Sequence, residues 1–557
     1  MQSKLDIKVE ETKNGKQTAK VNGYYLHSKY DPINEAKRFA AKHYKPEHLH
    51  ILFGTGMGYI AEELKKSFRH DERLVCIEPI IELKVRENCY DILIQNYSED
   101  DIDNILSNLI SFDKNVTVIC SPNYDKIFQN EFSNILKKIK DLVNLNKVFE
   151  NTLKRFAKDW HINYLHNIQD IDRDEGIEEL YKKINYPIVV ASGGPSLTKQ
   201  IPLLKEYRNK FILVSSGSTI NTLLHFGIAP DFAISIDGAE INYKHFEGKK
   251  FKNIKLVYSL FNHYKIKKCF EDEVYHFITQ DSAIGVEKHY HSIFNKAPVK
   301  LSGGGTVASY ALGFARYISN SPIAIIGQDL AYTDNKSHAE YNKNFTLIDE
   351  KSNDRELFYI DGYYGEKVLT DYSLYSMKKT FEVQISQLDF NEIIFNCTEG
   401  GAKIEGFNQL SFKEFCERYA LNDVEIEKSY NNKKINKMQI IKTLENDIEV
   451  YNQLLILAEE NLSLLKKVQN KRKFTEKIDK LLDKNDKEMN SIIKDSPISL
   501  VIQEFALEVL KNFSPKKEET QNEIFNRVFQ KNYYLYSKIK ETVTETINLT
   551  KELINQM

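Results

Sequence analysis

The sequence predicts an α/β protein in which a Rossmann-like central domain follows a smaller N-terminal α/β domain and precedes a C-terminal all-α domain. Two observations predict this organisation. Short apolar runs rich in β-branched residues lead directly into glycine- and hydroxyl-rich turns, mostly between Pro187 and Gly406, as in parallel α/β units. After Gly406 there are no glycines, only two prolines, and apolar residues recur at helical spacing. We expect domains at residues 1–165, 166–425 and 426–557.

Composition limits the possible classes of protein. A chain of 557 residues exceeds what one hydrophobic core supports, so several domains are expected. The 77 Lys+Arg and 79 Asp+Glu residues give a net charge of -2, which argues against general nucleic-acid binding. The N-terminus does not resemble a secretory signal, and no stretch of about 18 apolar residues could span a membrane. The six cysteines are scattered, which is typical of a reducing compartment, so a cytoplasmic location is expected.

The N-terminal region contains a βαβ pattern. An apolar strand at 48–53 enters the turn Gly54-Thr-Gly-Met-Gly58, a helix follows, and a second strand ends at Glu78. The turn lacks the third glycine of the dinucleotide fingerprint. It looks like the loop of S-adenosylmethionine-dependent methyltransferases, with Glu78 at the ribose-binding position. The alternative interpretation is a tight turn that holds no ligand. Helical sequence from about 123 to 167 leads out of this region.

Two turns of the central region are candidate anion sites. The buried strand 186–191 enters Ser192-Gly-Gly-Pro-Ser-Leu197, and the strand 211–215 enters Ser216-Gly-Ser-Thr219, each before a helix. Glycines allow close approach of a ligand, and the first amides of a helix have no intrahelical acceptor. Such amides favour a phosphate or carboxylate. We therefore predict that the first turn binds ligand through Gly193, Gly194, Pro195 and Ser196, and the second through Ser216 and Thr219.

Three further segments complete the predicted site. The strand 232–236 ends at Asp237, the turn 302–306 opens a helix, and the strand 323–326 ends in Gly-Gln-Asp-Leu-Ala-Tyr332. Ligands in open parallel sheets lie at the carboxyl ends of the strands. These segments contribute the candidate ligand-binding residues Asp237, Gly304, Gly305, Thr306 and Gln328. Together the turns predict one crevice that holds phosphate, ribose and base. The polar segment 333–338 leaves this site as a candidate lid or substrate loop.

The C-terminal region is predicted to be helical throughout. Apolar residues recur at three- and four-residue steps between Ile441 and Leu465, and similar stripes cover 498–513 and 524–553. Stripes of this kind indicate a packed bundle or a surface for a partner rather than catalysis.

Four central motifs occur in an order that resembles a known family. They are Ser192-Gly-Gly-Pro-Ser-Leu197, Pro230-Asp-Phe-Ala-Ile-Ser-Ile-Asp237, Gly327-Gln-Asp-Leu-Ala-Tyr332 and Thr398-Glu-Gly-Gly401. The set resembles the motility accessory factor (Maf) family of bacterial flagellin glycosyltransferases. More distantly, the central domain is similar to bacterial sialyltransferases that use CMP-sialic acid. The resemblance implies transfer of a nonulosonic acid, such as pseudaminic or legionaminic acid, from a CMP-activated donor to Ser or Thr hydroxyls of flagellin.

A mechanism for such a transfer assigns roles to individual residues by their position in this sequence. The sialyltransferase-like enzymes invert the anomeric centre and need no metal or other cofactor, so none is expected here. Tyr332 is the candidate phenol that stabilises the leaving phosphate, and Asp329 is expected to order its turn and contact the sugar. His338 is the candidate general base for the acceptor hydroxyl. Flagellin is expected to dock through the C-terminal helical domain.

Three alternatives remain open at this point. The first and second central motifs also resemble the archaeal 6-hydroxymethylpterin diphosphokinases, which would use ATP and Mg²⁺ with Asp231 and Asp237 as metal contacts. A methyltransferase would instead be centred on Gly54 to Glu78. A non-catalytic adaptor would hold flagellin through the C-terminal helices without binding nucleotide.

Overall fold

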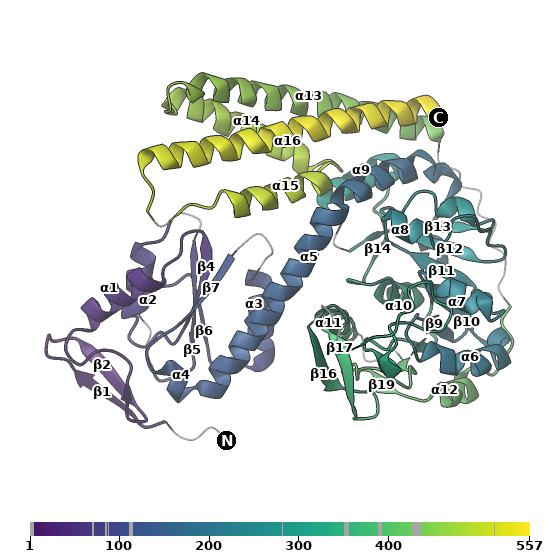
Figure 1. Cartoon of the computed structure of the whole chain (residues 1–557), viewed down its shortest axis with the longest axis horizontal. Helices are drawn as coiled ribbons and strands as arrows, with labels where there is room; N and C mark the ends of the chain where they lie inside the picture. The colour runs from purple at the N-terminus through teal and green to yellow at the C-terminus, as the bar shows by residue number, and fades with distance from the viewer. Residues whose placement is uncertain are drawn as a thin grey trace. The chain divides into compact units, whose positions relative to one another are not determined.

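The computed structural model describes residues 5–69, 72–83, 86, 88–110, 115–280, 282–349, 356–387, 393–425, 436–516 and 518–557. The fold is α/β with parallel sheets and a helical C-terminal region, which confirms the predicted fold class (Figure 1). Residues pack into two compact units. The first comprises Met1–Lys154, Leu462–Asp479 and Glu504–Ser537, and the second comprises Arg155–Asn461, Lys480–Gln503 and Lys538–Met557. The C-terminal helices thus contribute to both units, and the three-domain division remains a prediction.

The first unit is built on a four-stranded parallel sheet in the order β6-β5-β4-β7. Its strands are β4 (His48–Phe53), β5 (Arg73–Glu78), β6 (Ile92–Gln95) and β7 (Asn115–Cys120). Helices α1 (Pro32–His43) and α2 (Tyr59–Lys66) cover one face, and α3 (Glu99–Leu109) and the start of α5 (Gln129–Gln169) cover the other. An antiparallel sheet of β1 (Ile7–Glu11), β2 (Gln17–Val21) and β3 (Tyr24–Tyr25) precedes it, and α4 (Tyr124–Ile127) follows β7.

The second unit contains a ten-stranded sheet whose main path runs β14-β13-β12-β11-β10-β9-β15-β18-β19, all parallel. The strands are β8 (Glu175–Gly176), β9 (Ile188–Ala191), β10 (Ile212–Ser216), β11 (Phe232–Ser235), β12 (Lys255–Ser259), β13 (Val274–Thr279), β14 (Lys300–Leu301), β15 (Ile323–Ile326), β18 (Ile394–Asn396) and β19 (Asn408–Gln409). From β9 the chain adds strands in one direction through β14 and then returns to place β15 on the opposite side of β9. The boundary between β9 and β15 is therefore the topological switch point, where parallel α/β sheets hold ligands.

Helices cover both faces of this sheet. On one face, α10 (Val307–Ile318) and α11 (Tyr372–Ser386) pack on inward side chains such as Val190, Val214 and Ile325. On the other face, α6 (Leu197–Glu206), α7 (Thr219–His225) and α12 (Phe412–Tyr419) pack on Val189, Leu213 and Ala324. Toward β12 and β13, the end of α5 and α9 (Ile284–Phe294) form a third cluster. Alternate residues of each strand face opposite layers, which explains the continuous apolar runs in the sequence.

The remaining elements complete the second unit and the helical region. The hairpin β16 (Leu357–Asp361) and β17 (Lys367–Asp371) precedes α11, and α8 (Glu240–Tyr243) follows β11. The C-terminal helices are α13 (Lys437–Gln469), α14 (Glu476–Lys494), α15 (Ser499–Asn512) and α16 (Gln521–Gln556), as the apolar stripes predicted. Short 3-10 helices occur at η1 (Ile171–Arg173), η2 (Ile177–Leu180), η3 (Arg208–Lys210), η4 (Lys267–Cys269) and η5 (Thr333–Asn335). Of the helices the structure describes, none is both long and apolar enough to cross a membrane.

Candidate active site

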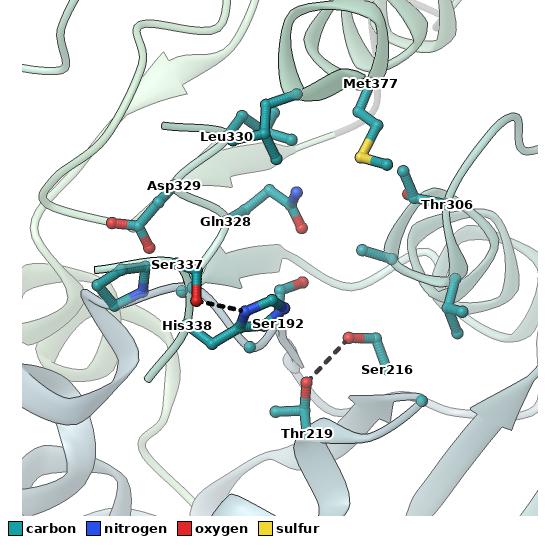
Figure 2. Close-up of a pocket in the computed structure, with 18 of the residues that line it drawn as sticks. Ser192, Ser216, Thr219, Thr306, Gln328, Asp329, Leu330, Ser337, His338 and Met377 are labelled. Atoms are coloured by element: carbon teal, nitrogen blue, oxygen red, sulfur yellow. Dashed lines mark hydrogen bonds between the residues drawn. The ribbon is translucent and has the colours of Figure 1, made fainter. Parts of the chain in front are cut away.

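A pocket of about 200 Å³ lies at the switch point of the large sheet. The turns after β9, β10 and β15 contribute its floor and walls, as Figure 2 shows. The N-terminus of α10, the segment around His338 and the side of α11 complete the lining. Nine residues predicted from the sequence line this pocket: Gly193, Gly194, Pro195, Ser216, Thr219, Thr306, Gln328, Asp329 and His338. The structure thus brings together segments that are more than 100 residues apart in the chain.

Asp329 joins the turn after β9 to the turn after β15, to which it belongs. Its side chain is 2 % exposed and accepts hydrogen bonds from the amide of Ser196 (3.1 Å), the hydroxyl of Ser196 (2.5 Å) and the hydroxyl of Thr333 (2.6 Å). Burial raises the pKa of Asp329, and the hydrogen bonds from Ser196 and Thr333 lower it again in part. The predicted role of Asp329 in ordering its turn is consistent with these contacts.

Glycines surround Asp329 because no side chain would fit. A Cβ on Gly194 would lie 2.2 Å from Oδ1 of Asp329, and a Cβ on Gly401 would lie 2.2 Å from its carbonyl oxygen. A Cβ on Gly400 would lie 2.3 Å from Oγ of Ser196. The motifs at 192–197, 327–332 and 398–401 therefore meet at one carboxylate, which gives a packing reason for their glycines.

Gln328 points into the pocket with an unsatisfied acceptor. Its side chain is 7 % exposed, and its Oε1 has no hydrogen-bond partner among the residues that the structure describes. Figure 2 shows the amide directed toward the space between Thr306 and His338. A buried carbonyl oxygen without a partner costs roughly 1–3 kcal/mol. A ligand N–H or O–H group at this position would remove that cost.

The pocket provides amides and hydroxyls rather than cationic side chains, since none of the residues found to line it is Lys or Arg. Val307 and Ala308 begin α10, so their amides have no intrahelical acceptor. The hydroxyl of Thr306 caps the helix by accepting a hydrogen bond from the amide of Ser309. The hydroxyls of Ser216 and Thr219 lie 3.3 Å apart at the opposite wall. A phosphate could bind between such groups.

His338 lies in the pocket as a partly buried imidazole. Its Nδ1 is 3.2 Å from the hydroxyl of Ser337, and its Cδ2 lies 3.8 Å from where a Cβ on Gly193 would be. Burial lowers the pKa of His338, and a hydrogen bond involving the backbone of Asn344 raises it in part. The ring is consequently neutral near pH 7, the state that a general base requires.

Five predicted residues lie outside the lining. Ser196 is buried behind the turn, where it binds Asp329, and Gly304 and Gly305 precede α10 beside Thr380. Tyr332 is 4 % exposed and its phenol donates a 2.7 Å hydrogen bond to Asp371. Asp237 follows β11, which lies two strands from β9, and accepts a hydrogen bond from the amide of Ala239 (2.9 Å). For Tyr332 this geometry favours a structural role over a catalytic one.

Several lining residues were missed by sequence reasoning. Leu374 and Met377 of α11 form an apolar wall, and nothing in their local sequence distinguishes them from core residues. Ser218 and Ser337 could have been found, because both lie in segments already singled out. Leu330 also lines the pocket, with a φ of 51° that is uncommon for a non-glycine residue and strained.

Comparisons with known proteins agree with this architecture. Residues 162–335 match the profile of a family described as 6-hydroxymethylpterin diphosphokinase MptE-like, which spans less than half of the chain. The whole fold is similar to the solved structure of the MAf glycosyltransferase from Magnetospirillum magneticum AMB-1. The TM-score is 0.58 with 12 % identity, over 99 % of this chain and 92 % of that chain. At this identity the likeness establishes the fold alone. No curated protein matches the sequence.

The pterin kinase alternative gave Asp231 and Asp237 as metal contacts, and the structure places them on either side of β11. Asp231 precedes β11, where it pairs with Arg208 (3.0 Å) and accepts a hydrogen bond from the amide of Leu213 (2.7 Å). Asp237 follows the same strand. At about 3.3 Å per residue, the six steps from Asp231 to Asp237 span up to about 20 Å in extended chain. They cannot bind one metal ion. Among the described residues, no three His, Cys, Asp or Glu side chains are grouped as metal ligands.

Side chains of the first unit itself occupy the space around its glycine turn. Glu78 is fully buried and accepts hydrogen bonds from the amides of Thr55 (2.7 Å) and Gly56 (2.8 Å) and from the phenol of Tyr124 (2.9 Å). His27 accepts a bond from the amide of Met57 (2.9 Å). A Cβ on Gly54 would lie 2.2 Å from the Tyr124 ring. The amides and the carboxylate that a nucleoside would need are thus already engaged, which favours the interpretation without a ligand.

Proposed function

We propose that the chain is a glycosyltransferase that moves a nonulosonic, sialic-acid-like sugar from a CMP-activated donor to Ser or Thr hydroxyls of flagellin, a step needed for flagellum assembly and motility. The observation that carries this proposal is the pocket at the switch point. There, amide-rich turns and the imidazole of His338 line the same space. The similarity to the fold of a solved Maf glycosyltransferase supports the same class of enzyme.

The proposed reaction is a single displacement at the anomeric carbon. The acceptor oxygen attacks this carbon while the bond to the phosphate oxygen of CMP breaks, and CMP leaves with the electron pair. His338 takes the proton from the acceptor hydroxyl. Amides at the start of α10 and in the turns after β9 and β10 stabilise the departing phosphate. This displacement inverts the anomeric centre and requires no cofactor.

The acceptor, flagellin, is proposed to dock on the C-terminal helices. These helices carry exposed apolar side chains, including Met438 (66 %) and Ile456 (56 %) on α13. A protein acceptor needs such a surface beyond the pocket itself.

A second candidate function is a Mg²⁺-dependent pyrophosphokinase of the 6-hydroxymethylpterin type. It is favoured by the family match over residues 162–335. The separation of Asp231 from Asp237 weakens it, because the two carboxylates cannot bind the same metal ion.

Calorimetric titration with CMP and with ATP, each in Mg²⁺ and in EDTA, separates these functions. The transferase predicts CMP binding in EDTA that is abolished by Ser218→Trp, since Ser218 lines the pocket. Ser386→Trp, at the exposed end of α11, is the matched control and should bind normally. Binding of ATP alone, and only with Mg²⁺, would support the kinase. Absence of any nucleotide binding would support a flagellin-binding adaptor.

A further inference from the structure

The side chain of Gln328 lines the pocket but has no part in the reaction proposed above. Its backbone is fixed on both sides. The amide of Gln328 donates to the hydroxyl of Thr398 (3.2 Å), and a Cβ on the preceding Gly327 would lie 2.3 Å from the carbonyl oxygen of Ser192. The residue that follows is Asp329, which is held by the hydrogen bonds described above. A fixed backbone therefore directs the side chain of Gln328 into the pocket.

Hydroxyl groups on the facing walls of the pocket are engaged within the protein. The hydroxyl of Thr306 donates to that of Ser309 (3.3 Å), and the hydroxyls of Ser216 and Thr219 lie 3.3 Å from each other. The side-chain oxygen of Gln328 has no hydrogen-bond partner in the part of the chain that the structure describes, although the residue is only 7 % exposed. Buried polar atoms of this kind are seldom left unpaired, so a ligand is expected to supply the missing donor.

The chemistry of Oε1 limits which ligand group can lie against it. A carbonyl oxygen accepts hydrogen bonds and cannot donate them. The phosphate and the carboxylate of a CMP-activated nonulosonic acid carry no proton near pH 7, so neither could donate to this oxygen. The ligand group that matches Gln328 is therefore a hydroxyl or an amide N–H.

The position of Gln328 assigns this group to the sugar rather than to the cytidine. In a single displacement the leaving oxygen and the attacking oxygen lie on opposite sides of the anomeric carbon. The proposed reaction places the leaving phosphate at the start of α10, beside Thr306, and the attacking hydroxyl at His338. Figure 2 shows the amide of Gln328 directed into the space between these two residues. The sugar ring would occupy this space.

We propose that Gln328 selects the sugar that is transferred, by accepting a hydrogen bond from a hydroxyl or acylamino N–H group of that sugar. This inference rests on the proposed function. A site built to pair with a ligand N–H or O–H rejects an analogue that lacks this group, because the buried oxygen is then left without a partner. Gln328 would thus distinguish among CMP-activated sugars that share the same cytidine and phosphate.

An unpaired buried acceptor also has a consequence for the protein without ligand. Gln328→Met keeps the length of the side chain and removes the oxygen, and Leu330 and Met377 already provide apolar side chains in the same pocket. Replacing an unsatisfied polar group with an apolar one of similar shape is neutral or stabilising. We therefore expect the ligand-free variant to unfold at the same temperature as the native protein or at a higher one.

The test combines thermal unfolding without ligand and calorimetric titration of the full-length protein with CMP and with CMP-N-acetylneuraminate. The titrations are done in EDTA and without acceptor. Both ligands contain cytidine and phosphate, and only the second contains a sugar with hydroxyl and acylamino groups. Gln387→Met is the matched control, because Gln387 is exposed at the end of α11. Gln328→Leu is the second apolar variant if Gln328→Met does not fold.

A contact with the sugar predicts that Gln328→Met binds CMP within about threefold of the native protein and CMP-N-acetylneuraminate about 5- to 50-fold more weakly. An equal loss for both ligands would place Gln328 against the cytidine and overturn its assignment to the sugar. Unchanged affinity for both would overturn the contact while leaving the transferase in place. An unfolding midpoint well below that of Gln387→Met would show that Gln328 is paired within the protein, which also overturns the inference. If the native protein binds neither ligand, the proposed function itself fails.

Discussion

The hydroxyl of Ser196 donates a 2.5 Å hydrogen bond to Oδ2 of Asp329, and through it the turn after β9 is joined to the turn after β15. These two parallel strands are neighbours because the chain, after adding β10 to β14 on one side of β9, returns to place β15 on the other side. Thr333 donates to the same oxygen (2.6 Å), so one buried carboxylate positions both walls of the pocket and the start of the segment that carries His338. The geometry of the site consequently depends on Asp329 although Asp329 is almost inaccessible to ligand.

Replacing Ser196 by alanine tests this relationship. The substitution removes one donor from a buried carboxylate, and we expect the free energy of unfolding to fall by about 1–3 kcal/mol. Ligand affinity should fall as well, because the two turns lose their connection. Chemical denaturation and calorimetry with CMP measure the two effects. Ser218→Ala, on the pocket wall, is the control for stability. If Ser196→Ala were as stable as that control, Asp329 would not organise the site.

His338 is expected to set the pH dependence of transfer. A base must be neutral, and the pKa of His338 lies below its ordinary value of 6.5. Activity, measured as kcat/KM, should rise with pH through a midpoint below 6.5 and then stay level. His338→Ala should slow turnover by roughly 10²–10⁴-fold with little loss of CMP affinity and should abolish this acidic limb. His291→Ala, an exposed histidine on α9, should change nothing. If the His338→Ala variant kept full turnover, His338 would not be the general base.

Tyr332→Phe distinguishes a structural from a catalytic phenol. The phenol donates to the buried carboxylate of Asp371, which also caps α11 by accepting from the amide of Leu374 (2.9 Å). Losing this donor should lower the free energy of unfolding by about 1–3 kcal/mol. Turnover by the folded fraction should stay within a few fold. A hundredfold slower variant of unchanged stability would instead restore the catalytic role inferred from the sequence.

The glycine turn of the first unit is not expected to bind S-adenosylmethionine. Glu78 satisfies the turn amides, so a ligand would have to displace both the carboxylate and Tyr124. We expect no shift in the thermal unfolding midpoint on adding S-adenosylmethionine. Glu78→Leu should destabilise the unit by about 3 kcal/mol or more, because several buried donors lose their acceptor. A ligand-dependent rise in the midpoint would show that the turn binds the nucleoside after all.

Sequence reasoning found the turns of the pocket because the carboxyl ends of parallel strands share one edge of a sheet. Sequence reasoning could not show which of these turns come together in the folded sheet. Asp237 follows a buried strand as Gln328 does. Only Gln328 lies at the switch point, because packing across the whole sheet decides which strand lies beside β9. Tyr332 follows Leu330, whose left-handed backbone redirects the chain. Tyr124, which fills the first glycine turn, is 68 residues away from Gly56. These outcomes depend on tertiary contacts that no local pattern contains.

The most direct test of the proposed transfer is the intact mass of flagellin after incubation with the purified protein and a CMP-nonulosonic acid in EDTA. The proposed function predicts discrete mass increases of one sugar residue each, located on Ser or Thr, with release of one CMP per addition. The same reaction with the His338→Ala variant should proceed far more slowly. Unmodified flagellin together with Mg²⁺-dependent conversion of ATP to AMP in the presence of 6-hydroxymethylpterin would contradict the account and assign the site to pyrophosphoryl transfer.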